Sequence, residues 1–73
     1  MSISEFGNRV ASARKDLDAT VGDIAFLSKI TPERIELIEG GADKSINALE
    51  IHRLAFALGT TYEFLMFGKV VVS

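Results

Sequence analysis

The stretch TVGDIAFLSKITPERIELIEGG, residues 20–41, has the pattern of two short helices joined by a tight turn. Thr20 is a helix-capping residue, and Asp23 follows it at the spacing of a capping box. The second helix has its own start signal, because Thr31 is a capping residue and Pro32 takes the first helical position, where its missing N–H costs nothing. The closing Gly-Gly pair tolerates the left-handed backbone that ends many helices. These signals predict a helix-turn-helix unit, a motif that DNA-binding proteins use.

The residues before this unit predict one longer amphipathic helix. It should span about residues 3–17, because Ser2 and Glu5 have capping-box spacing and apolar residues recur every three or four positions as far as Leu17. After a polar loop at residues 42–46, a fourth helix is expected. Asn47 caps this fourth helix, with Glu50 at the capping-box position. Its inward apolar face consists of Ala48, Ile51, Leu54, Ala55 and Leu58.

A last short helix and a tail complete the predicted fold. Thr60 is the expected cap, with Glu63 three residues later, and Gly68 stops the helix. Residues 69–73 are mostly β-branched and too few for another helix, so we expect an extended tail that is a candidate dimer contact. The sequence therefore predicts an all-α fold with five helices in one helix-turn-helix domain, residues 1–68, followed by this tail.

The composition of the 73-residue chain excludes several classes of protein. It contains no cysteine, so no disulfide framework or cysteine-bound zinc is expected, and a reducing cytoplasm is the natural location. No apolar run approaches the roughly 18–20 residues that span a bilayer, so we expect no membrane partner. His52 is the single histidine, and the acidic residues are scattered. We therefore expect no bound metal, no cofactor and no enzyme activity.

The charge balance gives no general attraction to DNA. Ten acidic and eight basic residues give a formal net charge of −2. The basic footprint typical of nucleic-acid-binding domains is therefore absent from the chain as a whole. A DNA-binding function is still compatible with this composition, because only the charge on the contacting face matters.

One set of residues, spread over the predicted helices, carries a family resemblance. The set consists of Ala25, Ile30, Thr31, Ile35, Ile38, Glu39 and Gly41, followed by the segment Leu54-Ala55-x-Ala57-Leu58-Gly59. Together these residues resemble the phage repressor and Cro-like family of bacterial helix-turn-helix proteins, the XRE type. The resemblance covers about residues 6–68, nearly the whole chain.

The resemblance implies a five-helix, lambda-repressor-like domain that binds double-stranded operator DNA as a homodimer. The helix at about residues 32–40 would be the recognition helix, placed in the major groove. The resemblance also implies an ion pair between Arg14 and Glu39, which would link the first helix to the end of the recognition helix. An arginine fork and a carboxylate, each beside an apolar stripe, are suitable partners at partial burial.

The expected DNA contacts lie on the recognition helix and at two neighbouring helix N-termini. Backbone N–H groups at such termini bind phosphates without side-chain charge. Arg34 is the only strong donor on the recognition helix, and its replacement by alanine is expected to weaken binding by about 1–3 kcal/mol. The candidate DNA-binding residues are Thr20, Val21, Thr31, Pro32, Glu33, Arg34, Leu37, Lys44 and Asn47.

Several positions depart from the family pattern. Members that read bases often carry glutamine early in the first helix of the unit and polar residues early in the second, where this chain has Val21, Pro32 and Leu37. Glu33 can accept a hydrogen bond from a cytosine amino group, and Leu37 can touch a thymine methyl group. Lys29 replaces the turn glycine, so either it adopts a left-handed backbone at a cost of about 1 kcal/mol or the turn changes.

Apolar residues at positions that the helical pattern assigns to solvent predict a partner surface. Phe26 and Leu37 are two of them, and more lie towards the C-terminus. We expect the C-terminal group to form a homodimer contact by helix packing or strand pairing. The candidate interface residues are Phe56, Phe64, Met66, Phe67, Val70, Val71 and Val72.

Two functions are compatible with these features. The first is a cytoplasmic, phage-like transcription regulator of the repressor type, which occupies an operator as a homodimer. The second is a protein-interaction or anti-repressor module on the same fold, whose acidic and apolar face binds another protein and not DNA. The scarcity of donors on the recognition helix favours the second function, whereas Arg34 and the neighbouring helix N-termini favour the first.

Overall fold

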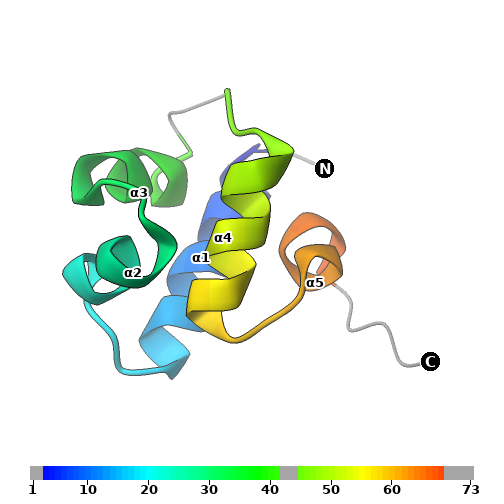
Figure 1. The fold of residues 1–73 in the computed structure, drawn as a ribbon. Helices are drawn as coiled ribbons and strands as arrows, with labels where there is room; N and C mark the ends of the chain where they lie inside the picture. Colours follow the sequence, from blue (N-terminus) through cyan, green and yellow to red (C-terminus); the bar gives the residue numbers. More distant parts are fainter. Residues whose placement is uncertain (1–2, 42–44, 69–73) are drawn as a thin grey trace.

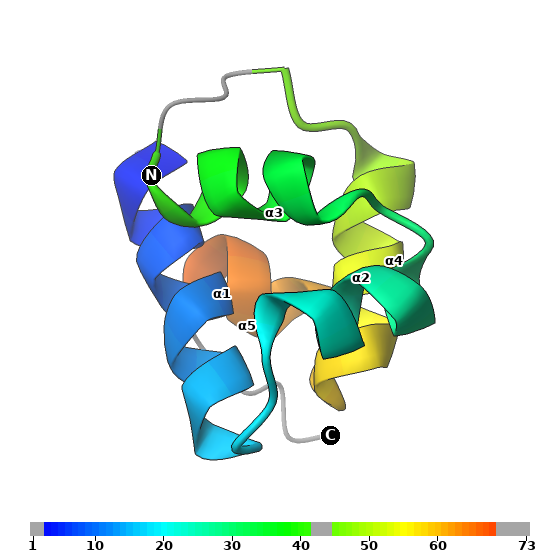
Figure 2. The same ribbon diagram turned by 90° about the vertical axis from the view of Figure 1, so that its left-hand side faces the viewer.

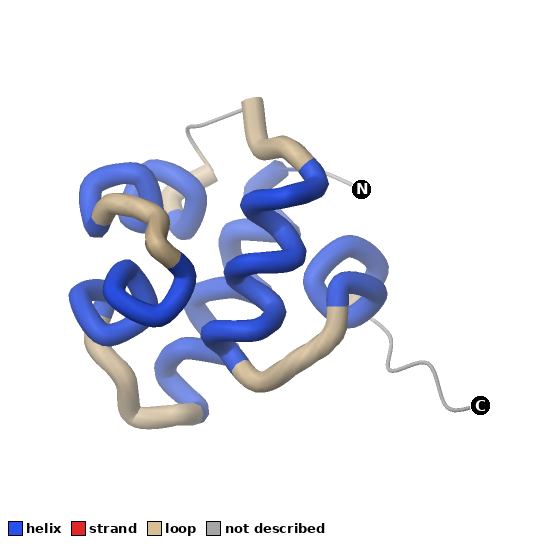
Figure 3. The backbone as a smooth tube through the Cα atoms, in the orientation of Figure 1, coloured by secondary structure: helices blue, strands red, loops and turns tan. Residues whose placement is uncertain are grey.

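The computed structural model describes residues 3–41 and 45–68, and within these ranges it is all-helical, with no strand (Figures 1 and 3). The predicted all-α fold class is confirmed; the predicted tail lies outside the described residues. None of the described helices is long and apolar enough to cross a membrane. The helices are α1 (Ile3–Asp16), α2 (Val21–Ser28), α3 (Pro32–Glu39), α4 (Ala48–Leu58) and α5 (Tyr62–Phe67).

Helices α1 and α4 lie at the centre, with α2 and α3 on one side and α5 on the other (Figure 1). Helix α3 packs mainly on α1 and α2, α2 also packs on α4, and α5 contacts both central helices. In the view of Figure 2, α2 and α3 face the reader and α5 lies behind. The helix-turn-helix unit therefore occupies one face of the protein.

One apolar core joins the described helices. Phe6 and Val10 from α1 meet Ile35 and Ile38 from α3 in this core, and α5 adds Leu65. A chain of this size buries only about 60% of its unfolded surface, so each apolar stripe matters. The complete set of buried apolar residues is Phe6, Val10, Ile24, Ala25, Ile30, Ile35, Ile38, Ile51, Leu54, Ala55, Ala57, Leu58 and Leu65.

Capping side chains set the starts of the helices. The Thr20 hydroxyl accepts from the Asp23 N–H at 3.0 Å, and the Asp23 carboxylate accepts from the Thr20 N–H at 2.9 Å. Asn47 and Glu50 form the equivalent capping box at α4. Both boxes confirm the sequence prediction. The pair predicted at Ser2 lies outside the described residues.

The predicted cap of α5 is wrong by one residue. The cap is Thr61, whose hydroxyl accepts from the Phe64 N–H at 3.0 Å. Thr60 instead donates its backbone N–H to the carbonyl oxygen of Ala55 at 2.9 Å, and this bond closes the C-terminus of α4. Because the backbone N–H of Thr60 closes α4, the next residue, Thr61, caps α5, which begins at Tyr62.

Two predicted core positions are also wrong. Leu17 is 52% exposed, because α1 ends at Asp16 and the chain then turns through Asp18, which has a positive φ of 56°. Ala48 is exposed as the first residue of α4, whereas Ala57, the second-last residue of that helix, is buried. In both cases the predicted apolar stripe reached past the part of the helix that is buried in the core.

Helices α1 and α3 approach most closely at Gly7, a position to which the sequence analysis gave no role. A Cβ atom at Gly7 would lie 2.2 Å from the carbonyl oxygen of Ile38 and 2.9 Å from that of Glu39. Both distances are shorter than any normal contact, and the obstructing atoms are backbone. Glycine is therefore required here for α3 to lie against α1.

An ion pair joins the same two helices. Arg14 donates from Nε to Glu39 Oε2 at 2.8 Å and from Nη2 to Oε1 at 2.9 Å, and its Nη1 donates to the carbonyl oxygen of Ala19 at 3.0 Å. The side chains are only 15% and 13% exposed. The hydrogen bonds that Arg14 donates to the Glu39 carboxylate raise the pKa of the Arg14 guanidinium above its ordinary value. The contact is the bidentate geometry in which arginine and carboxylate bind most strongly.

Replacing Gly7 with alanine should therefore destabilise the fold severely. We expect a loss of about 3 kcal/mol, a large part of the roughly 5 kcal/mol available to a domain of this size. The measurement is urea unfolding followed by circular dichroism. Gly22→Ala is the matched control, because a Cβ there meets only the Thr20 hydroxyl, at 3.6 Å. Equal stability of the two variants would show that α1 and α3 can separate without cost.

Candidate nucleic-acid interface

The turn between α2 and α3 uses a left-handed residue that is not glycine. Lys29 has φ 60° and ψ 30°, and its N–H donates to the carbonyl oxygen of Ala25 at 2.9 Å. Of the two predicted alternatives, the lysine therefore adopts the left-handed backbone and the turn is kept. Buried Ser28 accepts from the N–H of Ile30 at 3.3 Å, and Ile30 itself packs into the core. These two buried residues thus hold the turn in place.

Helix α3 has one buried and one exposed side. Ile35 and Ile38 are completely buried. On the other side Glu33 and Glu36 are exposed, and Leu37 is 49% exposed. Thr31 and Pro32 are also exposed, at the start of the helix. The residues that the sequence analysis placed on the outward face are therefore accessible, with the exception of Arg34.

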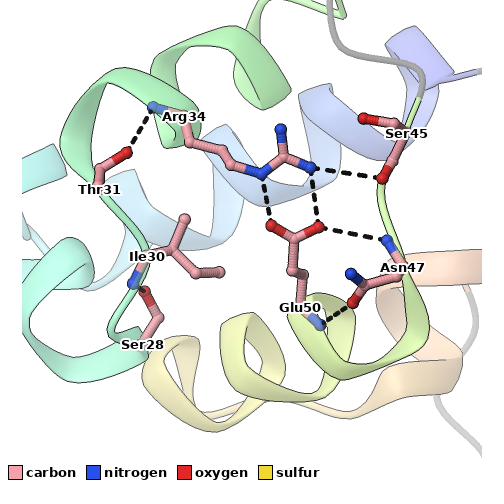
Figure 4. A network of polar contacts seen from close by, with 7 residues as sticks. All are labelled: Ser28, Ile30, Thr31, Arg34, Ser45, Asn47 and Glu50. Atoms are coloured by element: carbon pink, nitrogen blue, oxygen red, sulfur yellow. Dashed lines mark hydrogen bonds and ion pairs between the residues drawn. The ribbon is translucent and has the colours of Figure 1, made fainter.

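Arg34 points along the protein surface towards α4 and not outward (Figure 4). Its Nε donates to Glu50 Oε2, and its Nη2 donates to Glu50 Oε1 at 2.8 Å and to the carbonyl oxygen of Ser45 at 3.4 Å. The Arg34 side chain is 28% exposed and that of Glu50 is 14% exposed. The sequence analysis missed this pair, because Glu50 was assigned only to the cap of α4.

The other candidate DNA contacts lie at helix N-termini. Thr20 is exposed as the cap of α2, and Val21 beside it is half-buried against the core. Asn47 is exposed at the start of α4, where its side chain accepts from the Glu50 N–H at 2.9 Å. Lys44 lies outside the described residues. Thr20, Thr31 and Asn47 all use a side-chain oxygen to cap a helix.

The charge of the outward α3 face is negative. Arg34 and Glu50 neutralise each other, as do Arg14 and Glu39. The charges on α3 that are left after these pairs are the carboxylates of Glu33 and Glu36. Phosphates therefore meet no net positive charge on α3, and binding there must rely on backbone donors, shape and neighbouring elements.

The described candidate dimer residues do not share one groove. Phe56 is 79% exposed and lines a groove of about 350 Å³ with Leu27, Lys29 and other residues of α2 and α4. Phe64 and Met66 are half-buried against the core, and Phe67 is 62% exposed on α5. The three valines lie outside the described residues. Phe26 on α2 is 84% exposed, in agreement with its predicted position.

Two further contacts that the sequence analysis missed hold α5 in place. Arg9 donates from Nε to the carbonyl oxygen of Leu65 at 2.9 Å and from Nη2 to that of Met66 at 3.0 Å. His52 stacks on Tyr62 with ring centroids 4.6 Å apart. The described residues contain no group of three metal-binding side chains. The stacking of His52 on Tyr62 connects α4 to α5.

The strain at Lys29 is measurable. Lys29→Gly should stabilise the protein by about 0.5–1 kcal/mol, because glycine adopts the left-handed backbone without a Cβ penalty. Gly59, at the end of α4, is the reverse control: it has φ 67° and open space around its Cβ position. Gly59→Ala should destabilise by about 1 kcal/mol in the same urea titration. Destabilisation by Lys29→Gly would mean that the lysine side chain offsets its own strain.

No family model matches the sequence, and no curated protein matches it. Among solved structures, the chain is similar to the restriction-modification controller protein C.AhdI from Aeromonas hydrophila, with a TM-score of 0.82 and 25% sequence identity. The match covers 86% of this chain and 94% of the controller protein. The likeness confirms the fold that the sequence resemblance implies. The described part of the chain is a five-helix domain with the helix-turn-helix fold of this controller protein.

Proposed function

We propose that this protein is a DNA-binding transcription regulator of the repressor type, with α3 as the recognition helix in the major groove. The observation that carries the proposal is how α3 packs on the domain. Its isoleucines are buried, while Glu33, Glu36 and Leu37 are exposed on the opposite side. A short helix held in this way can enter a groove without unfolding. The likeness to a controller protein supports a regulator and weighs against an enzyme.

In this proposal the helix N-termini supply most of the phosphate contacts. The N–H groups of Thr20 and Asn47 donate to the carboxylates of Asp23 and Glu50. The N–H groups that follow these caps, from Val21 in α2 and from the first residues of α4, are therefore the ones that bind phosphates on the two sides of the groove. Lys44 adds one ion pair. Thr31, Pro32, Glu33 and Leu37 face the bases. The protein then works in the compartment that holds the DNA, which for a bacterial or phage regulator is the cytoplasm.

A charge-reversal pair tests whether α3 faces DNA. Glu36→Lys should tighten binding to a random-sequence duplex of about 30 base pairs roughly tenfold at low salt. The slope of the logarithm of affinity against the logarithm of salt concentration should become steeper by the amount expected for about one more phosphate contact. Glu63→Lys on α5 is the matched control, because it changes the net charge equally on the other side of the molecule (Figure 1). Fluorescence anisotropy gives both affinities. Equal effects of the two substitutions would reject α3 as the DNA-facing helix.

We also propose that the regulator binds as a homodimer through α5 and the residues beside it. Phe67 is 62% exposed, and the partly buried Phe64 and Met66 lie on the same helix. Phe56 lines the separate groove of α2 and α4, so it is not part of the α5 surface proposed here. The three valines at positions 70–72, also candidates from the sequence, lie outside the described residues. Two-fold symmetry would place two copies of α3 about 34 Å apart, the repeat of successive major grooves.

Phe67→Asp should therefore weaken self-association by about 2 kcal/mol or more, the effect of removing a central apolar anchor. Sedimentation equilibrium at several protein concentrations measures the association constant. Phe26→Asp is the control, since Phe26 is 84% exposed on α2, outside the proposed interface. A wild-type protein that stays monomeric at all concentrations would refute the dimer.

One observation favours a second function. Phe26, Leu27 and Phe56 expose apolar surface on α2 and α4, and the outward α3 face is acidic. A protein-interaction or anti-repressor module on this fold would have such surfaces. Absence of binding to any duplex at low salt, with the protein folded, would select this second function over the first.

A further inference from the structure

Arginine reads guanine by presenting two N–H donors from one edge of its guanidinium. The group has two such edges, Nε with Nη2 and Nη1 with Nη2, so both need Nη2. In Arg34 the Nε and one Nη2 hydrogen bind the two oxygens of Glu50, and Nη2 also donates to the carbonyl oxygen of Ser45 (Figure 4). Neither edge is therefore available to a base while this contact persists.

The carboxylate that binds Arg34 is itself fixed. The Glu50 N–H donates to Asn47 Oδ1 at 2.9 Å, and Glu50 Oε1 accepts from the Asn47 N–H at 3.3 Å. Glu50 is thus held by the capping box of α4 and cannot follow the arginine into a groove. Moving Arg34 to DNA would leave a carboxylate that is only 14% exposed without its cation, at a cost in free energy.

With Arg34 held, α3 presents acceptors and apolar groups but no cation of its own to a base pair. Glu33 can accept from the amino group of cytosine, and Leu37 can contact the methyl group of thymine. Guanine, whose major-groove edge carries only acceptors, has no bidentate side-chain donor on this helix unless Arg34 is released. The pair therefore determines which base edges α3 can recognise.

We propose that Glu50 is a positioning residue that withholds Arg34 from DNA, so that α3 reads its half-site through cytosine amino groups and thymine methyl groups. This inference rests on the proposed function and adds the class of base edges that is recognised. It also assigns Arg34 a role that differs from the direct base contact expected from the sequence.

The test compares the wild-type protein, Arg34→Met, Glu50→Gln and the double variant. Each is titrated with random-sequence duplex over a range of salt, and with its own binding sequence selected from a random library. The selected duplexes are measured again with guanine replaced by 7-deazaguanine, which lacks the N7 acceptor. Thermal unfolding checks that each variant is folded; glutamine keeps an oxygen that can accept from the Asn47 N–H.

If Glu50 withholds Arg34, Arg34→Met binds within about twofold of wild type, and Glu50→Gln binds roughly tenfold more tightly with a salt slope steeper by about one. The double variant returns to the wild-type affinity. Only Glu50→Gln then selects an additional guanine, and its binding is weakened by 7-deazaguanine at that position.

Two results overturn the inference in distinguishable ways. Wild-type binding that Arg34→Met weakens tenfold or more shows that Arg34 already touches DNA, and the inference alone fails. A weaker Glu50→Gln complex has the same meaning, with Glu50 supporting a bound arginine. Lack of duplex binding by all four folded proteins rejects the proposed function, and this inference with it.

Discussion

The close packing of α1 on α3 at Gly7 determines where the outward face of α3 points. The carbonyl groups of Ile38 and Glu39 lie where a side chain at residue 7 would be. Ile38 is completely buried beside this contact, and Glu39 receives the bidentate hydrogen bonds of Arg14. These contacts all involve the last turn of α3, so this end of the helix has one orientation. The 3.6-residue period then directs Glu33, Glu36 and Leu37 away from the core.

The other end of α3 is held by the buried Ile30 and Ile35 and, in addition, by polar contacts. Thr31 caps the helix, and the ion pair of Arg34 with Glu50 links it to α4, with which α3 shares little packing surface. A small domain has few apolar contacts with which to fix a helix, so this pair adds a link between α3 and α4, where apolar packing is small. The same pair removes the charge of Arg34 from the outward face. Arg34 can therefore either stabilise the contact of α3 with α4 or offer its positive charge to DNA, but not both at once.

Local signals in the sequence were sufficient for the helices and most of their starts. Capping boxes at Thr20 and Asn47 depend on residues three positions apart. For Lys29 the sequence left two alternatives, a left-handed backbone or a changed turn, and the structure has the left-handed backbone. The predicted cap of α5 was wrong because a neighbouring helix takes that residue: the Thr60 N–H closes the C-terminus of α4. The clearance at Gly7 and the partner of Arg34 depend on residues 16 or more positions away, and nothing in the periodicity indicates them.

For a DNA-binding role, the acidic α3 face limits the affinity that a single copy can reach. Each phosphate contact contributes through release of counterions, and a face with Glu33 and Glu36 gains little from this effect. Backbone N–H groups at the starts of α2 and α4 carry no net charge, so they add contacts with a weaker dependence on salt. Two linked copies on one duplex compensate for weak single contacts, because the second copy binds at a high effective concentration. Under the proposed function, the affinity would therefore come from the pairing of two copies, and the selectivity from the few side chains of α3 that would face the bases.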